Sequence, residues 1–136
     1  MVLYIFMVLI QKFLKVNYVR DTIMKSLFLG ILLFTIGQTA VWFQTNGQFI
    51  SPWMKNNPMI MAFLGVPISF AYIFATTYTV EYYEGDLWPS RLIGFAAGIV
   101  SFSFLTYIYM GEGLSLKTLI TLILAIIIVL IQVFYK

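Results

Sequence analysis

The chain has 136 residues, of which 62% are hydrophobic and only 10% are charged, with a formal net charge of +3. A soluble domain carries about 25% charged residues and is less than half apolar, so this composition excludes water as the solvent for most of the chain and indicates a bilayer. The absence of Cys and His argues against disulfides, thiol catalysis and the common zinc sites. We therefore predict no enzyme activity, no metal and no cofactor. The basic residues flank apolar segments, which fits topology determinants better than a nucleic-acid surface.

Four apolar runs follow one another along the chain, and each is long enough to cross a bilayer. About 20 helical residues span the hydrocarbon core. Leu, Ile, Phe and Ala with interspersed small residues favour helices over barrel strands, which alternate over about ten residues. We therefore predict an all-α fold, an integral membrane four-helix bundle. Its spans are expected at residues 26–43, 58–80, 92–110 and 118–135.

Residues at the ends of these runs mark the expected membrane boundaries. Trp42, Trp53 and Trp88 lie beside the first two connections, as Trp does in the aromatic belts of membrane proteins. Pro58 suits the first turn of a helix, whereas Pro67 lies within the second span and is expected to kink it. The connections are too short to hold an extramembrane domain.

The first 25 residues are expected to form a separate segment ahead of the four-helix domain, which we assign to residues 26–136. Residues 1–10 are apolar but too short to cross the bilayer, and residues 11–20 mix basic with apolar side chains. One interpretation is an interfacial helix that lies along anionic headgroups. Another is that translation begins at Met24, which leads directly into a span. A signal peptide fits poorly, because no positive charge precedes the apolar run.

Lys and Arg are distributed unevenly between the two expected sides of the membrane. With four spans, the side of the N-terminus holds six of them (Lys12, Lys15, Arg20, Lys25, Arg91 and Lys136), and the opposite side holds two (Lys55 and Lys117). Positive residues are retained on the cytoplasmic side, so we predict cytoplasmic termini in a plasma membrane of the bacterial inner-membrane type. A start at Met24 reduces the ratio to three against two, which permits insertion in both orientations.

The interiors of the expected spans contain no charged residue. All five acidic residues lie at edges or in connections: Asp21, Glu81, Glu84, Asp86 and Glu112. Ionisable groups inside a bilayer are the default functional candidates, and a proton-coupled antiporter normally needs a buried carboxylate. We therefore expect that any transport proceeds without direct proton exchange on a mid-membrane carboxylate.

An acidic and aromatic cluster lies at the end of the second span. Glu81, Glu84, Tyr78 and Tyr82 recur there at helical spacing, so carboxylates and phenol rings can form a cation mouth that holds a cation by charge and by ring faces. The alternative is a set of solvated interface residues, with Arg91 paired to Glu84 or Asp86. Such exposed pairs contribute at most about 1 kcal/mol.

Uncharged polar side chains inside the spans are the candidates for a substrate-binding site. Ser and Thr hydroxyls usually bond back to their own helix, but the amide of Gln38 needs a partner helix or a wet cavity. Hydrogen bonding between helices is its structural alternative. The candidate substrate site consists of Thr35, Gln38, Ser69, Tyr72 and Ser101.

Two spans differ in their expected packing. The third contains Gly94 and Gly98 at GxxxG spacing, which lets another helix backbone approach closely. The fourth is rich in Leu and Ile, with Ala125 as its only small residue, and is expected to face lipid or a partner subunit.

The last two spans and the turn between them resemble the carboxy-terminal part of the drug/metabolite transporter superfamily. There an aromatic helix end, a Gly-Glu or Gly-Gln turn and a short polar linker precede a final apolar helix, and this chain reads Tyr109-Met110-Gly111-Glu112-Gly113. The size and spacing are similar to the small multidrug resistance branch and to a less characterised four-helix branch. Residues 33–37 and Ser69-Phe70 resemble segments of the first and second helices of these exporters.

Two departures from that family concern its mechanism. Phe34 stands where the exporters have their coupling Glu, and Gly94 stands where their third helix has Trp. The resemblance therefore implies the fold, a homodimer that is often antiparallel and an ancestry in transport, but it does not carry over the proton-coupled mechanism.

On this basis we expect a small protein of the lipid bilayer that, as a homodimer, moves a small neutral or cationic metabolite. The alternative is a non-transporting helical subunit that stabilises a larger membrane complex. A solvated central cavity favours transport, whereas tight packing around Gln38 favours the subunit.

Overall fold

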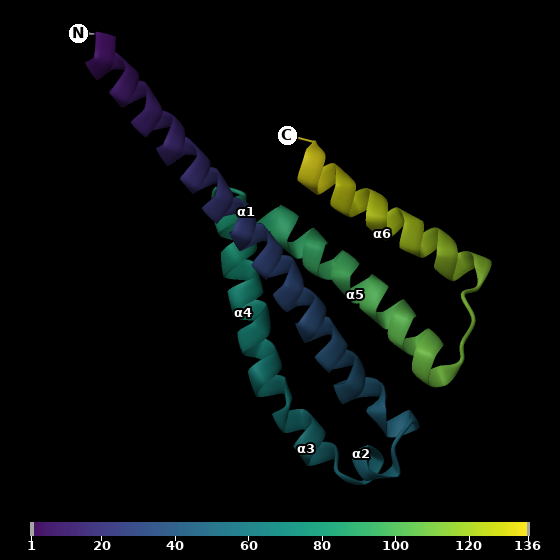
Figure 1. Cartoon of the computed structure of the whole chain (residues 1–136). Coiled ribbons are helices and arrows are strands. Elements are labelled where there is room, and N and C mark those ends of the chain that lie inside the picture. Colours follow the sequence, from purple (N-terminus) through teal and green to yellow (C-terminus); the bar gives the residue numbers. More distant parts are fainter. Residues whose placement is uncertain (1, 136) are drawn as a thin grey trace.

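The computed structural model describes the backbone of residues 2–135 and the side chains of residues 22–132 and 134–135. In this part of the chain every regular element is a helix (Figure 1), which confirms the predicted all-α fold. The elements in order are α1 (Val2–Asn46), the short 3₁₀ helix η1 (Gly47–Phe49), α2 (Pro52–Asn56), α3 (Pro58–Phe63), α4 (Gly65–Tyr82), α5 (Leu87–Met110) and α6 (Leu116–Phe134).

Three segments of the described chain are long and apolar enough to cross a membrane: Thr22–Phe49, Pro58–Tyr82 and Leu87–Met110. The apolar part of α6, Leu116–Gln132, is shorter. The whole of α6 has 19 residues and is about 28 Å long at 1.5 Å per residue, close to the hydrocarbon thickness of about 30 Å. The chain is therefore a multi-pass membrane protein with three to four spans.

Helix α1 passes through the boundary expected at residue 25 without interruption. It is 45 residues long, and its first part extends beyond the other helices (Figure 1). The side chains of residues 1–21 lie outside the described part. The interfacial position of the N-terminal segment and the start at Met24 therefore stay predictions.

The second span consists of two helices, α3 and α4, which meet at Leu64. Pro67 has no N–H, so the carbonyl of Phe63, four residues earlier, loses its helical partner. The chain changes direction between α3 and α4 (Figure 1), and the kink predicted for this span is confirmed. Pro58 lies at the start of α3, as predicted.

Helix α1 is central to the bundle, because α4 and α5 both pack on it, whereas α6 packs on α5. At Gly30 of α1, a Cβ atom would lie 3.1 Å from the carbonyl oxygen of Ala75 in α4. Only glycine lets the two backbones approach this closely. The buried core beside this crossing is formed by Leu27, Phe34, Ala75 and Ile93.

Buried polar bonds join the same helices. The Thr79 hydroxyl of α4 donates to Ser90 Oγ of α5 at 2.6 Å, and the Trp42 indole N–H of α1 donates to Thr106 Oγ1 of α5 at 3.0 Å. Trp42 is only 2% exposed, so its predicted place in an aromatic belt is wrong. Its indole lies between helices because α5 supplies a hydrogen-bond acceptor there.

Helix α6 is the outer helix. Ala125 is its fully buried residue, while bulky side chains such as Ile123, Ile127 and Ile131 are exposed. It follows α5 by a turn in which Gly111 adopts a left-handed conformation (φ 66°) and Ser115 caps the first turn of α6. The exposed bulky surface fits the expected contact of this helix with lipid or with a partner subunit.

Candidate functional site

Where α1 crosses α5, two side chains of α1 pack on two glycines of α5. Phe34 and Gln38 lie one turn apart on α1, and Gly94 and Gly98 lie one turn apart on α5. A Cβ atom added at Gly94 would lie 2.9 Å from the Phe34 ring, and one added at Gly98 would lie 2.9 Å from the Gln38 amide. Gln38 Nε2 also donates to the Gly94 carbonyl at 3.0 Å. The two glycines therefore face α1 within the same chain, and the Gln38 amide joins the two helices.

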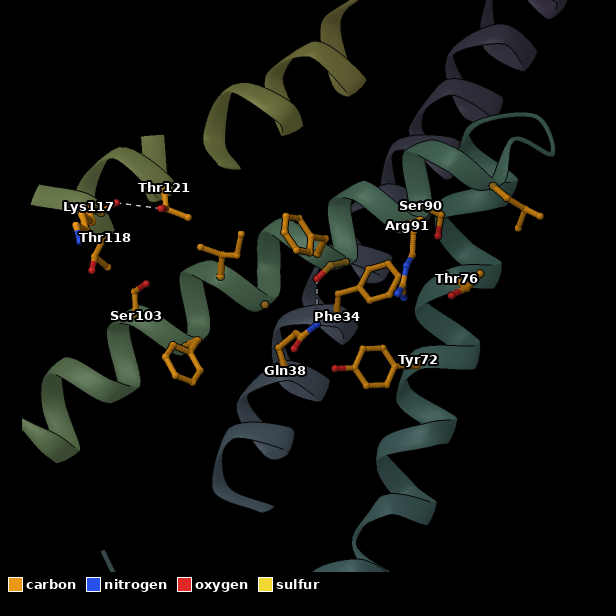
Figure 2. A pocket seen from close by; sticks show the side chains of 16 residues that line it. Phe34, Gln38, Tyr72, Thr76, Ser90, Arg91, Ser103, Lys117, Thr118 and Thr121 are labelled. Carbon is orange, nitrogen blue, oxygen red and sulfur yellow. Dashed lines mark hydrogen bonds between the residues drawn. The ribbon is translucent and has the colours of Figure 1, made fainter. Parts of the chain in front are cut away.

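A cavity of about 910 Å³ lies beside this crossing, between α1, α4, α5 and the first turns of α6 (Figure 2). Helix α5 contributes most of its wall. The lining residues are Phe34, Gln38, Tyr72, Thr76, Leu87, Ser90, Arg91, Gly94, Phe95, Gly98, Ile99, Phe102, Ser103, Lys117, Thr118 and Thr121. Those from α5 recur every three to four residues, which is the spacing of one helix face. The cavity is therefore elongated along one side of α5.

One end of the cavity is rich in unpaired hydrogen-bond donors. In Figure 2 the Arg91 side chain extends from α5 toward the Phe34 ring, with Thr76 and Tyr72 of α4 beside it. Among the described residues, the Arg91 guanidinium and the Tyr72 and Thr76 hydroxyls have no hydrogen-bond or ion-pair partner. Ser90 differs, because its hydroxyl already has a hydrogen-bond partner in Thr79. This end, which we call the arginine end, thus offers three donor groups to a ligand.

The opposite end of the cavity is formed by the start of α6. The Thr121 hydroxyl donates to the Lys117 carbonyl at 2.9 Å, and the Thr118 hydroxyl bonds to Ser115 Oγ at 2.9 Å. Both threonine hydroxyls are therefore already used within α6 and its cap, and the Lys117 amine is the cationic group on this side.

The structure brings two of the five candidate substrate residues into the cavity wall, Gln38 and Tyr72. Thr35 is exposed and donates to the Ile31 carbonyl, and Ser69 is exposed and donates to the Gly65 carbonyl. Ser101 is buried but is not part of the lining. The hydroxyls of Thr35 and Ser69 follow the usual bonding of Ser and Thr back to their own helix.

The four residues of the expected cation mouth have different surroundings in the structure. Glu81 and Glu84 are exposed, and Glu81 accepts a hydrogen bond from Ser26 at 3.3 Å. The Tyr82 ring packs edge-on against Tyr83, with centroids 4.8 Å apart. Tyr78 is half-buried on α4. In the described part of the chain no group of three or more acidic, His or Cys side chains is placed to hold a metal ion.

Arg91 lines the cavity, and among the described residues it has no ion pair with Glu84 or Asp86. The alternative pairing considered for it is therefore wrong. The sequence did contain a signal for its position, because Arg91 precedes Gly94 by three residues and Gly98 by seven. These spacings place it on the face of α5 that carries the glycines.

Comparisons with models of known protein families, with curated proteins and with solved structures find no match to this chain. The resemblance to the drug/metabolite transporters accordingly stays a prediction from the residues quoted for it.

Proposed function

We propose that this protein binds a small molecule in the cavity between α1, α4, α5 and α6 and moves it across the bilayer. The observation that carries this proposal is a cavity of about 910 Å³ with Gln38, Tyr72 and Arg91 in its wall. Small-molecule sites typically have volumes of about 300–1,000 Å³. Arg91, which is exposed near the start of α5, adds a charged group to this wall.

The proposal includes a homodimer. Transporter sites generally lie between repeats or subunits near the middle of the bilayer. The exposed bulky side chains of α6 offer a surface for a second copy, and the resemblance to the drug/metabolite transporters supports the same assembly. The distribution of Lys and Arg supports cytoplasmic termini in a plasma membrane of the bacterial inner-membrane type.

The charges in the cavity lining restrict which of the predicted substrates fit. Arg91 and Lys117 are the charged residues among the sixteen side chains drawn around the cavity, and the set contains no carboxylate. A cation would meet two like charges there without a partner, which disfavours it. Our proposal therefore leaves out the cationic substrate of the sequence-based prediction, and it admits a neutral or an anionic one.

Reconstitution into proteoliposomes tests transport directly. We expect the wild type to release at least one member of a panel of small neutral and anionic solutes faster than protein-free liposomes. Arg91→Gln should reduce that flux, whereas Lys25→Gln, which removes an exposed charge away from the cavity, should not. Release equal to that of protein-free liposomes for the whole panel would contradict the transport function.

One observation favours the second candidate, a non-transporting helical subunit of a larger membrane complex. The Gln38 amide is bonded to Gly94 and packed on Gly98, so this group acts as a tie between helices. The subunit function predicts that the chain extracted in mild detergent runs in a hetero-oligomer and is inactive in liposomes. A homodimer that supports flux would exclude it.

A further inference from the structure

We infer that the cavity accepts an anionic amphiphile, with a carboxylate or phosphate head at the arginine end and a single apolar tail along α5. This inference rests on the proposed function of the cavity as a ligand site, and it specifies the chemical class of the ligand. It joins three independent features of the cavity: the sign of its charge, the position of its unpaired donors and the apolar wall between its ends.

The charge of the cavity selects an anion. Its lining contains one guanidinium and one ammonium group and no carboxylate among the described side chains. Arg91 is exposed near the start of α5, so its guanidinium is accessible to a ligand. Because the described chain supplies no ion-pair partner for Arg91, an anionic ligand group is the natural partner for it. A guanidinium also matches carboxylate and phosphate oxygens with paired donors.

The unpaired donors place the head at Arg91 and not at Lys117. Arg91, Tyr72 and Thr76 all have donors without partners among the described residues, and they gather at one end. At the other end the hydroxyls of Thr118 and Thr121 are already bonded within α6 and its cap. The arginine end therefore offers three such donor groups from two helices, whereas the other end offers two, the Lys117 amine and the Ser103 hydroxyl.

The wall between the two ends suits an apolar tail. Phe95, Ile99 and Phe102 line this stretch at spacings of four and three residues, on the same face of α5 as Arg91. The result is an elongated apolar surface that begins at a cationic head site, which is the pattern of an amphiphile and not of a small inorganic anion.

Binding to the full-length protein in nanodiscs of zwitterionic lipid tests this inference. A spin-labelled fatty acid serves as the probe, and its immobilised fraction is measured against concentration. We expect saturable binding that Arg91→Gln weakens about tenfold or more, the scale of one lost hydrogen bond to a charged group. Arg91→Lys, which keeps the charge, should lose less. The matched control Lys25→Gln should bind as the wild type does. Lys117→Gln should weaken binding less than Arg91→Gln does, because the end of the cavity beside Lys117 offers fewer unpaired donors.

Competitors define the ligand and its source. An alkyl phosphate should displace the probe, whereas an alkyl trimethylammonium of the same tail length should not. Inorganic phosphate tests whether the tail is needed. If phosphatidylglycerol added to the nanodisc displaces the probe, the bilayer supplies the ligand. If it does not, a free single-chain amphiphile is the ligand. Both results support the anionic amphiphile.

Several results would overturn the inference. These are unchanged affinity in Arg91→Gln with an unchanged unfolding temperature, equal displacement by the ammonium compound, displacement by inorganic phosphate at similar concentration, or a larger loss in Lys117→Gln than in Arg91→Gln. Binding without flux in liposomes would refute transport and leave the ligand class standing. Flux of a neutral solute without anion binding would support transport and refute the anionic ligand.

Discussion

The contact between α1 and α5 gives the sharpest prediction about this fold, because it rests on a single missing side chain. Gly98→Ile would place a branched side chain where the Gln38 amide now lies. The Cβ atom alone would be 2.9 Å from Gln38 Cδ and Nε2 and 3.0 Å from Oε1. Gln38 must then leave, and its hydrogen bond to Gly94 at 3.0 Å is lost.

The expected cost has two parts. Inserting extra methylene groups into a packed contact typically costs about 1–3 kcal/mol. An interhelical hydrogen bond in a membrane contributes about 0.6 kcal/mol on average. We therefore expect Gly98→Ile to destabilise the bundle by about 2–4 kcal/mol. Gly98→Ala should cost less, because a single methyl group meets the end of a flexible side chain.

Thermal unfolding in detergent and in lipid, together with cross-linking of the oligomer, measures this effect. Gly113→Ile is the matched control, because a Cβ at Gly113 has no neighbouring atom within 4 Å, and it should be nearly neutral. The double variant Gln38→Ala with Gly98→Ile should lose less stability than the two single variants together, since the clashing amide is gone. The subunit fold should weaken before the oligomer does, because both partners of this contact belong to one chain.

An unchanged unfolding temperature in Gly98→Ile would refute this reasoning. It would mean that the two helices do not cross at these glycines and that the GxxxG spacing faces lipid. A full additive loss in the double variant would likewise show that Gln38 is not the group displaced.

Three further predictions concern topology, coupling and a buried phenol. Cysteines introduced at Asn46 and Ser115 should react with an external reagent, and one at Asp86 should not. Asp86 lies in the α4–α5 turn, at the opposite end of the bundle from Asn46 and Ser115 (Figure 1). External labelling at Asp86 would contradict the predicted orientation. Flux in proteoliposomes should not respond to an imposed pH gradient, and a gradient-driven flux that is lost in Glu81→Gln would disprove this. Tyr83→Phe should raise stability by about 1 kcal/mol, because Tyr83 Oη is buried without a hydrogen-bond partner among the described residues. Burial also raises the pKa of Tyr83, so folding favours its protonated form. The wild type should therefore lose stability as the pH rises through about 10 and above, more than Tyr83→Phe does in thermal unfolding.

The sequence by itself determined the class of fold and the positions of most helix ends. Long apolar runs without the alternation of barrel strands form helices in a bilayer, because backbone polar groups must be satisfied within the protein. Local chemistry then set the boundaries: Pro58 begins α3, Pro67 follows the break at Leu64, and Gly111 ends α5. Each of these effects acts over one turn of chain and can be read without knowing what packs against it.

Only the tertiary structure decided which side chains face one another. Trp is a residue type typical of membrane interfaces, but Trp42 is buried against α5, where its indole N–H donates to the Thr106 hydroxyl. Thr35 and Gln38 are both polar and belong to one span, but Gln38 meets α5 whereas Thr35 is exposed on the surface of α1. The sequence indicates only a topology determinant at Arg91, whereas in the folded chain Arg91 lines the cavity beside α4 and α5.

The physical reason is that the polarity of the residues does not determine which face of a helix turns toward the protein when lipid and protein interior are both apolar. In water a hydrophobic stripe shows which face is buried, but lipid and protein interior are equally apolar, so close contact and a few polar bonds set the rotation instead. Here Gly94 and Gly98 receive Phe34 and Gln38 from an element that lies more than 50 residues away along the chain. That long-range fit fixed the face of α5 that lines the cavity.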